Sequence, residues 1–475
     1  MQTPMTQGQA AAARFKPFVE ETLASRVCAM AHPLRAEVFQ TPERISLAEA
    51  QRGDYRRVQT GWRWGPAWST AWFRVRGEVP REMAGRRVCL RFSTATEGLL
   101  WRDGVPYHGF DVNRDTAVLF PVATGGEAVD LYVEAACNHV LGITDKLFWE
   151  PPEQQARWRE ETPGRFERCE LVTVDQDAWK LMRTFEFVRL LVEQLADDSP
   201  HMAKLITGLE AVSSSPVGPD AVEILHEALG RRGSLPSSRC WTVGHAHLDT
   251  AWLWPIAETK RKALRTFASS LRLMERFPDY HFLCTQPQQY QWVKEQSPQL
   301  FEQIRQRVTE GRWEPLGAFW VEPDGNLPSG ESFVRQILHA NRFWSENFPD
   351  LPPQRLAYLP DTFGFAASLP QIFRLAGLDT FITNKLWWNQ TNEFPHIHFR
   401  WRGIDETEIL SHLTPGQEYN ATNTPFELMR GQRIAARKDP HHLPWLQPFG
   451  YGDGGGGPTD WTILYSQLRD RKSVV

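Results

Sequence analysis

The sequence predicts a multidomain protein in which an antiparallel β-sandwich comes first, a helical connector follows and an α/β domain comes last. Three observations predict this order. Apolar residues alternate in short segments between about residues 38 and 163, take helical spacing from 175 to 232, and form short runs between long helical segments after 240. A chain of 475 residues is long enough for two or three domains.

The N-terminal pattern is typical of half-buried strands. Apolar residues take every second position in 88–92 and again in 129–133, so each run would turn one face towards a core. Asp103-Gly104, between these runs, has the residues of a tight hairpin turn. We therefore expect an antiparallel β-sandwich, with a structural or oligomer-forming role favoured over sugar binding.

The connector is expected to be helical because apolar residues from Leu181 to Leu195 keep helical spacing. The polar stretch Asp197–Pro200 would break this helical run. Ser213–Pro219 is a predicted loop, and Gly233–Ser238 is a predicted linker into the last domain.

The last domain alternates helices with strands. Its expected helices are 257–277, 289–310 and 332–347, and its expected strands include 281–284, 313–317, 356–359 and 380–383. This alternation is typical of a parallel sheet or a β/α barrel, in which functional groups gather at the C-terminal ends of the strands.

The densest group of such residues follows the apolar run 241–243. His245, His247 and Asp249 take alternate positions, so in an extended backbone they project to one side. Imidazole and carboxylate groups together suit zinc or a similar divalent ion. Trp252, just beyond them, would give a sugar ring a flat platform. A polar loop with satisfied histidines is the alternative, which the tight clustering at a strand end disfavours.

Two further carboxylates follow predicted strands or turns. Asp361 lies just after the strand 356–359, where the alternative is the N-cap of a helix near 366–376. Asp453 lies in a glycine-rich loop, where the alternative is a plain Asp-Gly turn.

Five segments together resemble class II α-mannosidases, glycoside hydrolase family 38. The segments are HAHLDTAWLWP (245–255), WVEPDGNLPSGES (320–332), LPDTFGF (359–365), NKLWWNQ (384–390) and GYGDGGGGPT (450–459). Their order and spacing match over roughly residues 50–460. The resemblance is greater to the cytosolic and bacterial branch of the family than to the secreted branch.

The resemblance implies a role for each matching residue. His247, Asp249 and Asp361 would hold Zn²⁺ or another divalent metal such as Co²⁺, and Asp361 would also be the catalytic nucleophile. Asp453 matches the general acid/base, and Trp252 matches the aromatic that stacks under mannose. The implied reaction is retaining hydrolysis of terminal α-D-mannosidic linkages in mannose-containing oligosaccharides, in which two carboxyl groups lie about 5–5.5 Å apart.

Other residues in the same segments are candidate sugar contacts. Glu322 and Asp324 follow the strand-like stretch 318–321, and Lys385 and Trp388 follow the strand 380–383. Surface or supporting positions are the alternative for the two carboxylates. His245 is expected to support the metal site without binding the ion.

The family's fourth metal ligand is a histidine well beyond Asp453, and the sequence stops at Val475 before that motif. We therefore expect a C-terminally truncated chain that binds metal weakly and is impaired as an enzyme. His396, His398 and His412 could replace the ligand, although the pattern disfavours each.

The expected domains are an N-terminal extension (1–37), the β-sandwich (38–170), the helical connector (171–236) and a (β/α)7-type barrel (237–475) that is incomplete at its C-terminus. Two other functions stay open. One is a truncated, non-catalytic carbohydrate-binding remnant. The other is a zinc amidohydrolase-type hydrolase, which also opens with His-x-His but would need further histidines at later strand ends.

Composition fits a carbohydrate enzyme. The formal net charge of −4 gives no reason to expect nucleic acid or membrane binding. The N-terminal 15 residues lack the apolar core of a signal peptide, and the six cysteines are scattered, so a cytoplasmic location is expected. The resemblance also suggests a homo-oligomer.

Overall fold

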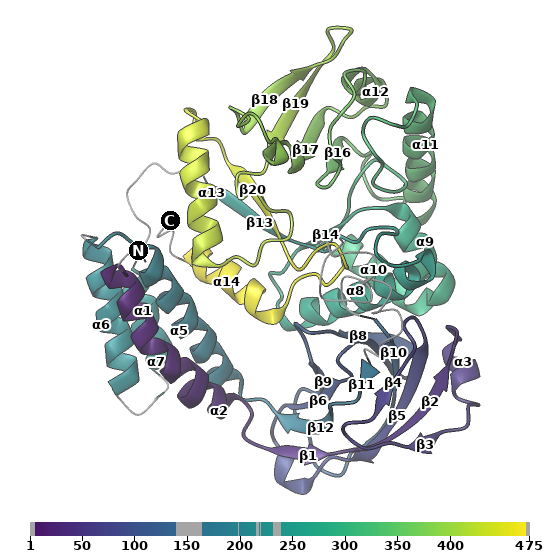
Figure 1. Cartoon of the computed structure of the whole chain (residues 1–475), viewed down its shortest axis with the longest axis vertical. Coiled ribbons are helices and arrows are strands. Elements are labelled where there is room, and N and C mark those ends of the chain that lie inside the picture. The colour runs from purple at the N-terminus through teal and green to yellow at the C-terminus, as the bar shows by residue number, and fades with distance from the viewer. Residues whose placement is uncertain are drawn as a thin grey trace. The chain divides into compact units, whose positions relative to one another are not determined.

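The computed structural model describes residues 5–138, 164–197, 199–214, 218, 220–230 and 239–471. The chain divides into two compact units (Figure 1). Unit 1 comprises Met1–Leu235, Asn423–Met429 and Asp460–Val475, and unit 2 comprises Pro236–Thr422 and Arg430–Thr459. The predicted linker Gly233–Ser238 lies outside the described residues. Residues 215–217 and 219 of the predicted loop Ser213–Pro219 also lie outside them.

Two antiparallel sheets form the first part of unit 1. The larger has the strand order β3-β2-β5-β10-β7-β8, the smaller has the order β1-β12-β6-β9, and β4 pairs with β11. The bounds are β1 (Ala31–Pro33), β2 (Arg35–Thr41), β3 (Arg56–Arg57), β4 (Arg63–Trp64), β5 (Thr70–Glu78), β6 (Val88–Ser93), β7 (Glu97–Arg102), β8 (Val105–Phe110), β9 (Thr116–Phe120), β10 (Ala128–Ala136), β11 (Gly164–Arg165) and β12 (Arg168–Thr173).

The two sheets share one buried core, so the predicted antiparallel β-sandwich is confirmed. Phe73 of the larger sheet and Phe92 of the smaller lie in the same apolar cluster, with ring centroids 5.4 Å apart. The predicted runs 88–92 and 129–133 lie in β6 and β10. Asp103 and Gly104 form the turn between β7 and β8, and both have the positive φ that a tight hairpin turn requires.

Helices form the second part of unit 1. Their bounds are α1 (Gln7–Pro17), the π-helix η1 (Phe18–Leu23), α2 (Ala24–Val27), α5 (Gln176–Gln194), α6 (Pro200–Ser214), α7 (Ala221–Leu229) and α14 (Asp460–Arg471), while α3 (Leu47–Ala50) and η2 (Arg81–Met83) belong to sandwich loops. The predicted helical run 181–195 falls in α5, whose apolar face is buried. Phe15 of α1 and Tyr465 of α14 contact that helix through Phe185 and Phe187 respectively.

Unit 2 contains the alternating strands and helices that the sequence predicts. Its strands are β13 (Cys240–His245), β14 (Phe282–Cys284), β15 (Trp313–Pro315), β16 (Leu356–Leu359), β17 (Thr380–Thr383), β18 (His398–Arg402), β19 (Glu408–Leu413) and β20 (Trp445–Phe449). Its helices are α8 (Ile256–Arg276), α9 (Pro287–Gln296), α10 (Pro298–Thr309), α11 (Gly330–Asn347), α12 (Leu369–Leu375), η3 (Lys385–Trp388) and α13 (Pro425–Lys438), of which α13 begins in unit 1.

The closed barrel is not confirmed. The strands form two four-stranded sheets, β15-β14-β13-β20 and β16-β17-β19-β18, in which every pair is parallel except β18 with β19. Within the described residues no ladder joins the two sheets. Barrel closure needs a continuous, staggered ladder, and the edge strand β15 has only three residues.

Two local predictions were wrong. The expected helix 289–310 is two helices, because Pro298 has no backbone N–H to donate and a new helix begins there under the Ser297 cap. The stretch 318–321 forms bends instead of a strand. Its residue Phe319 packs into the apolar cluster of Phe333, Phe373 and Phe381, so its hydrophobicity reflects burial of a loop.

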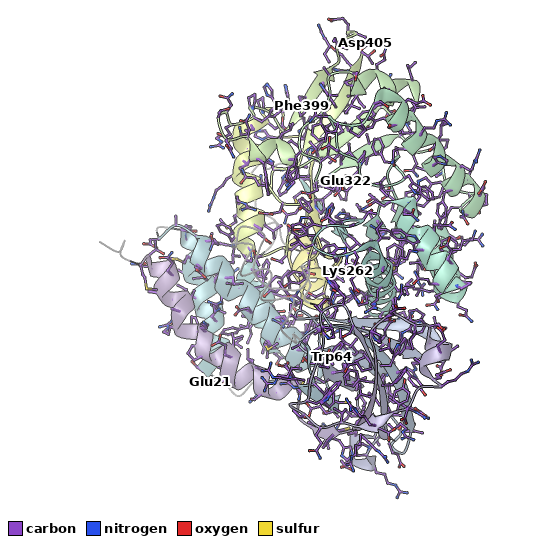
Figure 2. All side chains as sticks on the ribbon, turned by 45° about the vertical axis from the view of Figure 1, so that its right-hand side comes forward. Glu21, Trp64, Lys262, Glu322, Phe399 and Asp405 are labelled. Carbon is purple, nitrogen blue, oxygen red and sulfur yellow. The ribbon has the colours of Figure 1, made fainter. Side chains whose placement is uncertain are left out.

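In unit 2, apolar side chains fill the space between the sheet β16-β17-β19-β18 and the helices α11 and α12. Glu322 of unit 2 is half-buried, whereas Asp405 is exposed in the turn of the β18–β19 hairpin (Figure 2). None of the six cysteines, all of which lie in the described residues, forms a disulfide. In the part of the chain that the structure describes, no helix is both long enough and apolar enough to cross a bilayer.

Candidate active site and metal centre

The candidate residues lie after the C-terminal ends of parallel strands in unit 2. His247 and Asp249 follow β13, Asp361 follows β16, and Asp453 follows β20. Parallel pairing puts these ends at one edge of each sheet, so residues far apart in sequence can meet there. This edge is where the sequence predicts the site.

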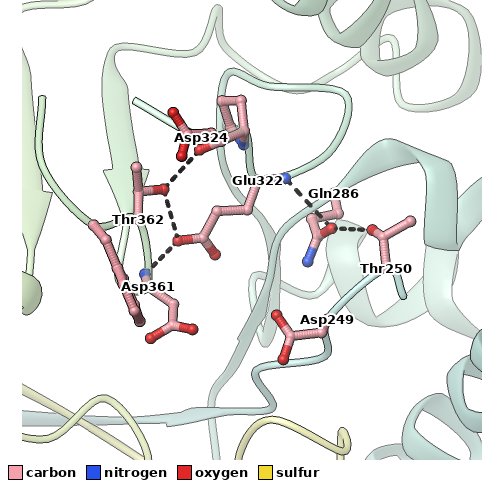
Figure 3. Close-up of a pocket in the computed structure, with 9 residues that line it drawn as sticks. Asp249, Thr250, Gln286, Glu322, Asp324, Asp361 and Thr362 are labelled. Atoms are coloured by element: carbon pink, nitrogen blue, oxygen red, sulfur yellow. Dashed lines mark hydrogen bonds between the residues drawn. The ribbon is translucent and has the colours of Figure 1, made fainter. Parts of the chain in front are cut away.

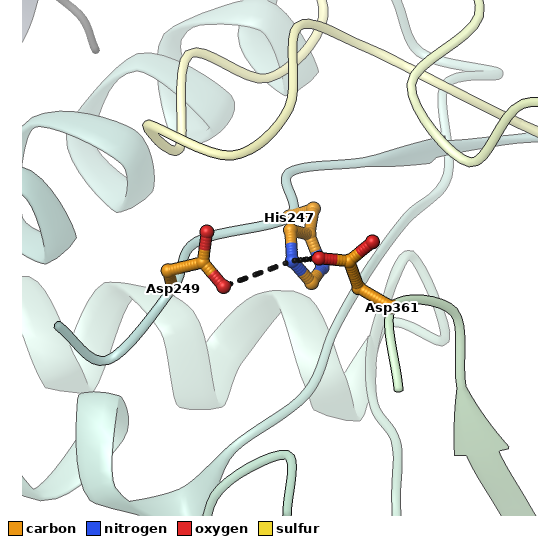
Figure 4. A group of neighbouring side chains, drawn as sticks. All are labelled: His247, Asp249 and Asp361. Carbon is orange, nitrogen blue, oxygen red and sulfur yellow. Dashed lines mark ion pairs between the residues drawn. The ribbon is translucent and has the colours of Figure 1, made fainter. Parts of the chain in front are cut away.

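His247, Asp249 and Asp361 come together as a group of possible metal ligands. Nε2 of His247 lies 3.4 Å from Oδ1 of Asp249 and 3.7 Å from Oδ2 of Asp361, and the two carboxylates approach the ring from different sides (Figure 4). The ligand atoms all lie within 4.8 Å of one another. Nε2 is buried and has no hydrogen-bond partner in the described residues. One imidazole and two carboxylates with an unsatisfied nitrogen at the centre fit Zn²⁺ or a similar ion.

Three carboxylates surround His247 and control its charge. Burial lowers the pKa of His247, but Asp249, Glu322 and Asp361 more than reverse this effect and raise the pKa to about 10. The surroundings of Nε2 therefore favour a positive charge. A divalent cation at Nε2 would meet the carboxylates of Asp249 and Asp361, whereas Glu322 lies on the Nδ1 side of the ring.

Glu322 connects His247 to Asp361. One carboxylate oxygen lies 3.6 Å from Nδ1 of His247, and the other accepts the backbone N–H of Asp361 and the hydroxyl of Thr362. Burial raises the pKa of Glu322 to about 7, against the opposing effect of His247. A carboxylate at the second nitrogen of a metal-binding histidine orients the ring. The sequence predicts Glu322 as a sugar contact, and the structure gives it these supporting contacts within the wall of the pocket.

A pocket of about 270 Å³ lies beside this group (Figure 3). Its lining residues are Asp249, Thr250, Gln286, Glu322, Pro323, Asp324, Asp361, Thr362 and Phe363. The volume is close to the lower end of small-molecule sites, roughly 300–1,000 Å³, so the pocket suits one small ring. Asp324 lines it as the sequence predicts, but its Oδ1 also accepts the backbone N–H groups of Asn326 and Leu327.

Gln286 is a pocket residue that the sequence reasoning missed. Its amide accepts the Thr250 hydroxyl (2.7 Å) and donates to the carbonyl of Leu248 (2.9 Å), so it fixes the backbone between His247 and Asp249. It has a left-handed backbone, with φ of 67°, directly after β14. A polar residue at the end of a parallel strand was the signal that could have found it.

Asp453 belongs to a loop that is tied to the histidine segment through backbone contacts. The N–H of Asp249 donates to the carbonyl of Asp453 (3.1 Å), and the N–H of Gly455 donates to the carbonyl of His247 (2.9 Å). Burial raises the pKa of Asp453, while His247 and a hydrogen bond from Tyr419 oppose the rise. The raised pKa favours the protonated carboxyl.

Tyr419 is the second residue that the sequence reasoning missed. Its hydroxyl donates to Oδ1 of Asp453 (2.8 Å), and its ring centroid lies 4.8 Å from that of His247. Burial raises the pKa of Tyr419, and the nearby Asp453 and Asp361 carboxylates raise it further. Tyr419 lies outside the five recognised segments, so no local pattern marked it.

The predicted aromatic sugar contacts are exposed, whereas the predicted cationic contact, Lys385, is buried. Trp252 and Trp388 are 39% and 64% exposed, so both ring systems reach solvent. Lys385 is buried, and its Nζ lies 2.5 Å from Oδ1 of Asp361. The structure therefore brings Lys385 to the catalytic carboxylate that the sequence predicts.

Three other histidines considered in the sequence, His245, His398 and His412, have partners outside the ligand group, whereas His396 is exposed. Burial lowers the pKa of His245 to about 3, and its Nδ1 lies 3.4 Å from the carbonyl of Leu283. His412 uses both nitrogens, one with the carbonyl of Ile397 and one with the N–H of Leu446. His398 stacks on His412 and pairs with Asp439.

Comparison with known families covers most of the chain. Residues 238–472 match the family described as Glycosyl hydrolases family 38 N-terminal domain. Residues 32–162 match the family described as Alpha-mannosidase, jelly roll domain. The jelly roll match falls on the β-sandwich part of the chain, and the family 38 match falls on the α/β part that follows it.

Three relatives align over nearly the whole chain. Alpha-mannosidase 2C1 of Homo sapiens is 36% identical over 434 residues, which are 89% of this chain and 41% of that protein. Alpha-mannosidase G of Dictyostelium discoideum is 32% identical over 93% of this chain and 41% of its own length. Alpha-mannosidase of Saccharomyces cerevisiae is 31% identical over 86% of this chain and 39% of its own length.

The chain thus spans about 41% of the length of the first of these relatives. The solved alpha-mannosidase from Enterococcus faecalis V583 is similar over 49% of this chain and 27% of its own, with a TM-score of 0.42 and 21% identity, which is too low to decide the fold. Two family matches in chain order, together with relatives aligned over most of the sequence, show that the chain belongs to glycosyl hydrolase family 38.

Proposed function

We propose that this chain hydrolyses terminal α-D-mannosidic linkages of mannose-containing oligosaccharides with retention of configuration. The observation that carries the proposal is the group formed by His247, Asp249 and Asp361, to which the Asp453 loop is tied by backbone hydrogen bonds. The relatives' names, all alpha-mannosidases, support the substrate class.

We assign the metal to His247, Asp249 and Asp361. Zn²⁺ suits this donor set, and Co²⁺ is an alternative. When bound, the ion would orient the sugar's hydroxyl groups and provide electrostatic stabilisation as charge develops at the transition state. Glu322 and Gln286 would hold the ligand residues in place through the contacts described above.

The two carboxyl groups of a retaining glycosidase need different protonation states, because one attacks and the other donates a proton. Asp361 is assigned as the nucleophile, and it lies between two cationic groups, the Lys385 ammonium and the His247 ring. Asp453 is assigned as the acid that protonates the leaving oxygen, and burial keeps its pKa high for that purpose.

Sugar recognition would use the oxygen-rich wall of the pocket and the exposed rings beside it. Asp249, Thr250 and Asp324 offer acceptors or donors to sugar hydroxyls. The exposed faces of Trp252 and Trp388 are suited to stack on apolar faces of sugar rings.

The (β/α)7-type barrel, the domain boundaries, the homo-oligomer and the cytoplasmic location stay predictions.

Release of nitrophenol from an aryl α-mannoside tests the proposal. The wild-type chain is assayed with added zinc and with chelator. The variant Asp361→Ala, which lacks the assigned nucleophile, is assayed in the same way. We expect metal-dependent turnover that Asp361→Ala abolishes. Binding of mannoside without turnover in a folded, zinc-loaded chain would instead support the carbohydrate-binding alternative. The amidohydrolase alternative is less well supported, because the ligand group in the described residues contains a single histidine.

A further inference from the structure

Lys385 lies in a cage formed by three aromatic rings and one carboxylate. Its side chain is 3% exposed. Nζ lies 3.5 Å from the ring centroid of Trp388, 4.5 Å from that of Phe363 and 5.3 Å from that of Tyr419. A buried ammonium group is costly unless a negative group compensates it, and Asp361 provides that charge.

The two oxygens of Asp361 face different cationic groups. Oδ1 lies 2.5 Å from Nζ of Lys385, and Oδ2 lies 3.7 Å from Nε2 of His247. The backbone N–H of Asp361 donates to Glu322. The residue is therefore held from three directions, and only Oδ2 faces the group of metal ligands.

The cage argues against a direct sugar contact by Lys385. Phe363 and Trp388 are 61% and 64% exposed, so these rings cover the ammonium group and would themselves meet solvent or ligand. Aromatic faces attract the ammonium group, and exclusion of water strengthens its pairing with Asp361. A sugar hydroxyl would have to displace a ring to reach Nζ.

We propose that Lys385 is the positioning residue for Asp361: it holds Oδ1, leaves Oδ2 to the metal, and weakens metal binding while it fixes the nucleophile. This inference rests on the proposed function, because it assumes that Asp361 is both ligand and nucleophile. The physical reason is that the ammonium group and a divalent cation share one carboxylate and repel each other. If Lys385 only supported the structure, its removal would disorder Asp361 and lower the affinity for metal. If its charge repels the metal, its removal should raise that affinity.

The test is titration of the full chain with zinc alone, in competition with a chelator. We expect Lys385→Met to bind zinc roughly tenfold more tightly than wild type, because the repelling charge is gone. Lys385→Arg keeps the repelling charge, so it is expected to bind zinc less tightly than the neutral variants. Lys385→Gln, which keeps a hydrogen-bond donor without the charge, serves as the second neutral variant if the methionine variant does not fold.

Lys438→Met is the matched control. Lys438 is also a buried lysine, with a side chain 8% exposed, 3.2 Å from Glu393 and 5.5 Å from the ring centroid of Trp387. It lies on α13 and contacts no residue of the ligand group in those interactions. Its substitution is expected to leave zinc affinity unchanged.

Two further measurements separate the proposals. Asp361→Ala is expected to weaken zinc binding, and an unchanged affinity would reject the metal site itself. If Asp361→Ala weakens binding but the neutral Lys385 variants bind zinc no more tightly than wild type, only the positioning role is overturned. In turnover, the neutral variants are expected to lose kcat while KM changes little, with recovery in Lys385→Arg.

Discussion

Asp361 and Asp453 carry the same functional group in different surroundings. Asp361 lies between the ammonium group of Lys385 and the ring of His247. Asp453 is half-buried beside Tyr419, and this burial raises its pKa. Two carboxyl groups in such different surroundings suit the separate roles of an acid and a nucleophile.

The raised pKa of Asp453 predicts the pH dependence of turnover. The acid must be protonated, so kcat/KM should fall as pH rises through this raised pKa. Asp453→Asn is expected to abolish this alkaline limb and to lower kcat about 10²–10⁴-fold on substrates with poor leaving groups, with a smaller loss on activated aryl mannosides. Profiles of kcat/KM against pH measure both effects. Asp405→Asn, in an exposed hairpin turn, is the control, and an alkaline limb that persists in Asp453→Asn would reject the assignment.

Glu322 predicts a change in metal affinity. Glu322→Gln keeps an oxygen that can accept the backbone N–H of Asp361 but removes the negative charge next to Nδ1 of His247. Loss of such a supporting carboxylate typically lowers metal affinity about 10–100-fold. Zinc titration of the variant checks this, and wild-type affinity in a correctly folded variant would contradict it.

The sequence predicted which carboxylates and which histidine to examine, because each lies in a recognisable segment at the end of a predicted strand. It did not predict their partners. Gln286 and Tyr419 act through contacts between distant segments. Tyr419 has no local pattern, and Gln286 has only its position after a parallel strand. For Glu322 the sequence left a sugar contact and a supporting position open, and for Lys385 it predicted a sugar contact, because a sequence shows proximity to a site without showing where a side chain points.

At the scale of elements, the packing of α13 on β20 depends on Gly431. A Cβ atom added there would lie 2.5 Å from Cη2 of Trp445, a fully buried side chain. Such a short contact forces a shift, and the indole ring has no flexible end that could move aside. The glycine is therefore required by close approach of the helix to the strand.

Gly431→Ala should consequently destabilise the protein even though alanine is the better helix former. The change gains about 1 kcal/mol in helix propensity and costs up to about 3 kcal/mol in overpacking, so we expect a net loss of about 1–2 kcal/mol. Denaturant unfolding measures the free energy. The same substitution in a Trp445→Phe background should cost less, and equal costs in the two backgrounds would show that the contact is not the cause.

Element types were predicted well where patterns were long. The helices α8 and α11 and the strands β16 and β17 fall where periodicity placed them. The errors came from single residues and from tertiary context. Pro298 divides one expected helix, and Phe319 is apolar because a loop is buried. Closure of strands into a barrel depends on pairing between distant segments, which periodicity does not report.

At the scale of the whole molecule, the two units should respond to different perturbations. The ligand group lies entirely within unit 2, so zinc should stabilise that unit by mass action. Tyr465 and Phe187 belong to unit 1, where their ring centroids lie 5.1 Å apart and both side chains are buried. Truncation of either ring should remove about 3–5 kcal/mol from unit 1.

We therefore expect two thermal transitions in scanning calorimetry. Zinc should raise one of them, and Tyr465→Ala should lower the other. The double variant with Phe187→Ala should be less destabilised than the sum of the single variants, because the rings share one contact. A single transition that responds to both zinc and Tyr465→Ala would show that the units unfold cooperatively.

The pairing of α14 with α5 has a consequence for how the protein is made. The ribosome finishes α5 at Gln194, whereas α14 begins at Asp460. At typical rates of translation the interval between them is on the order of tens of seconds. During that time the surface of α5 that Tyr465 will cover has no partner from its own chain. The nascent protein thus passes through a period in which chaperones and neighbouring chains compete for an apolar helix that the finished molecule hides.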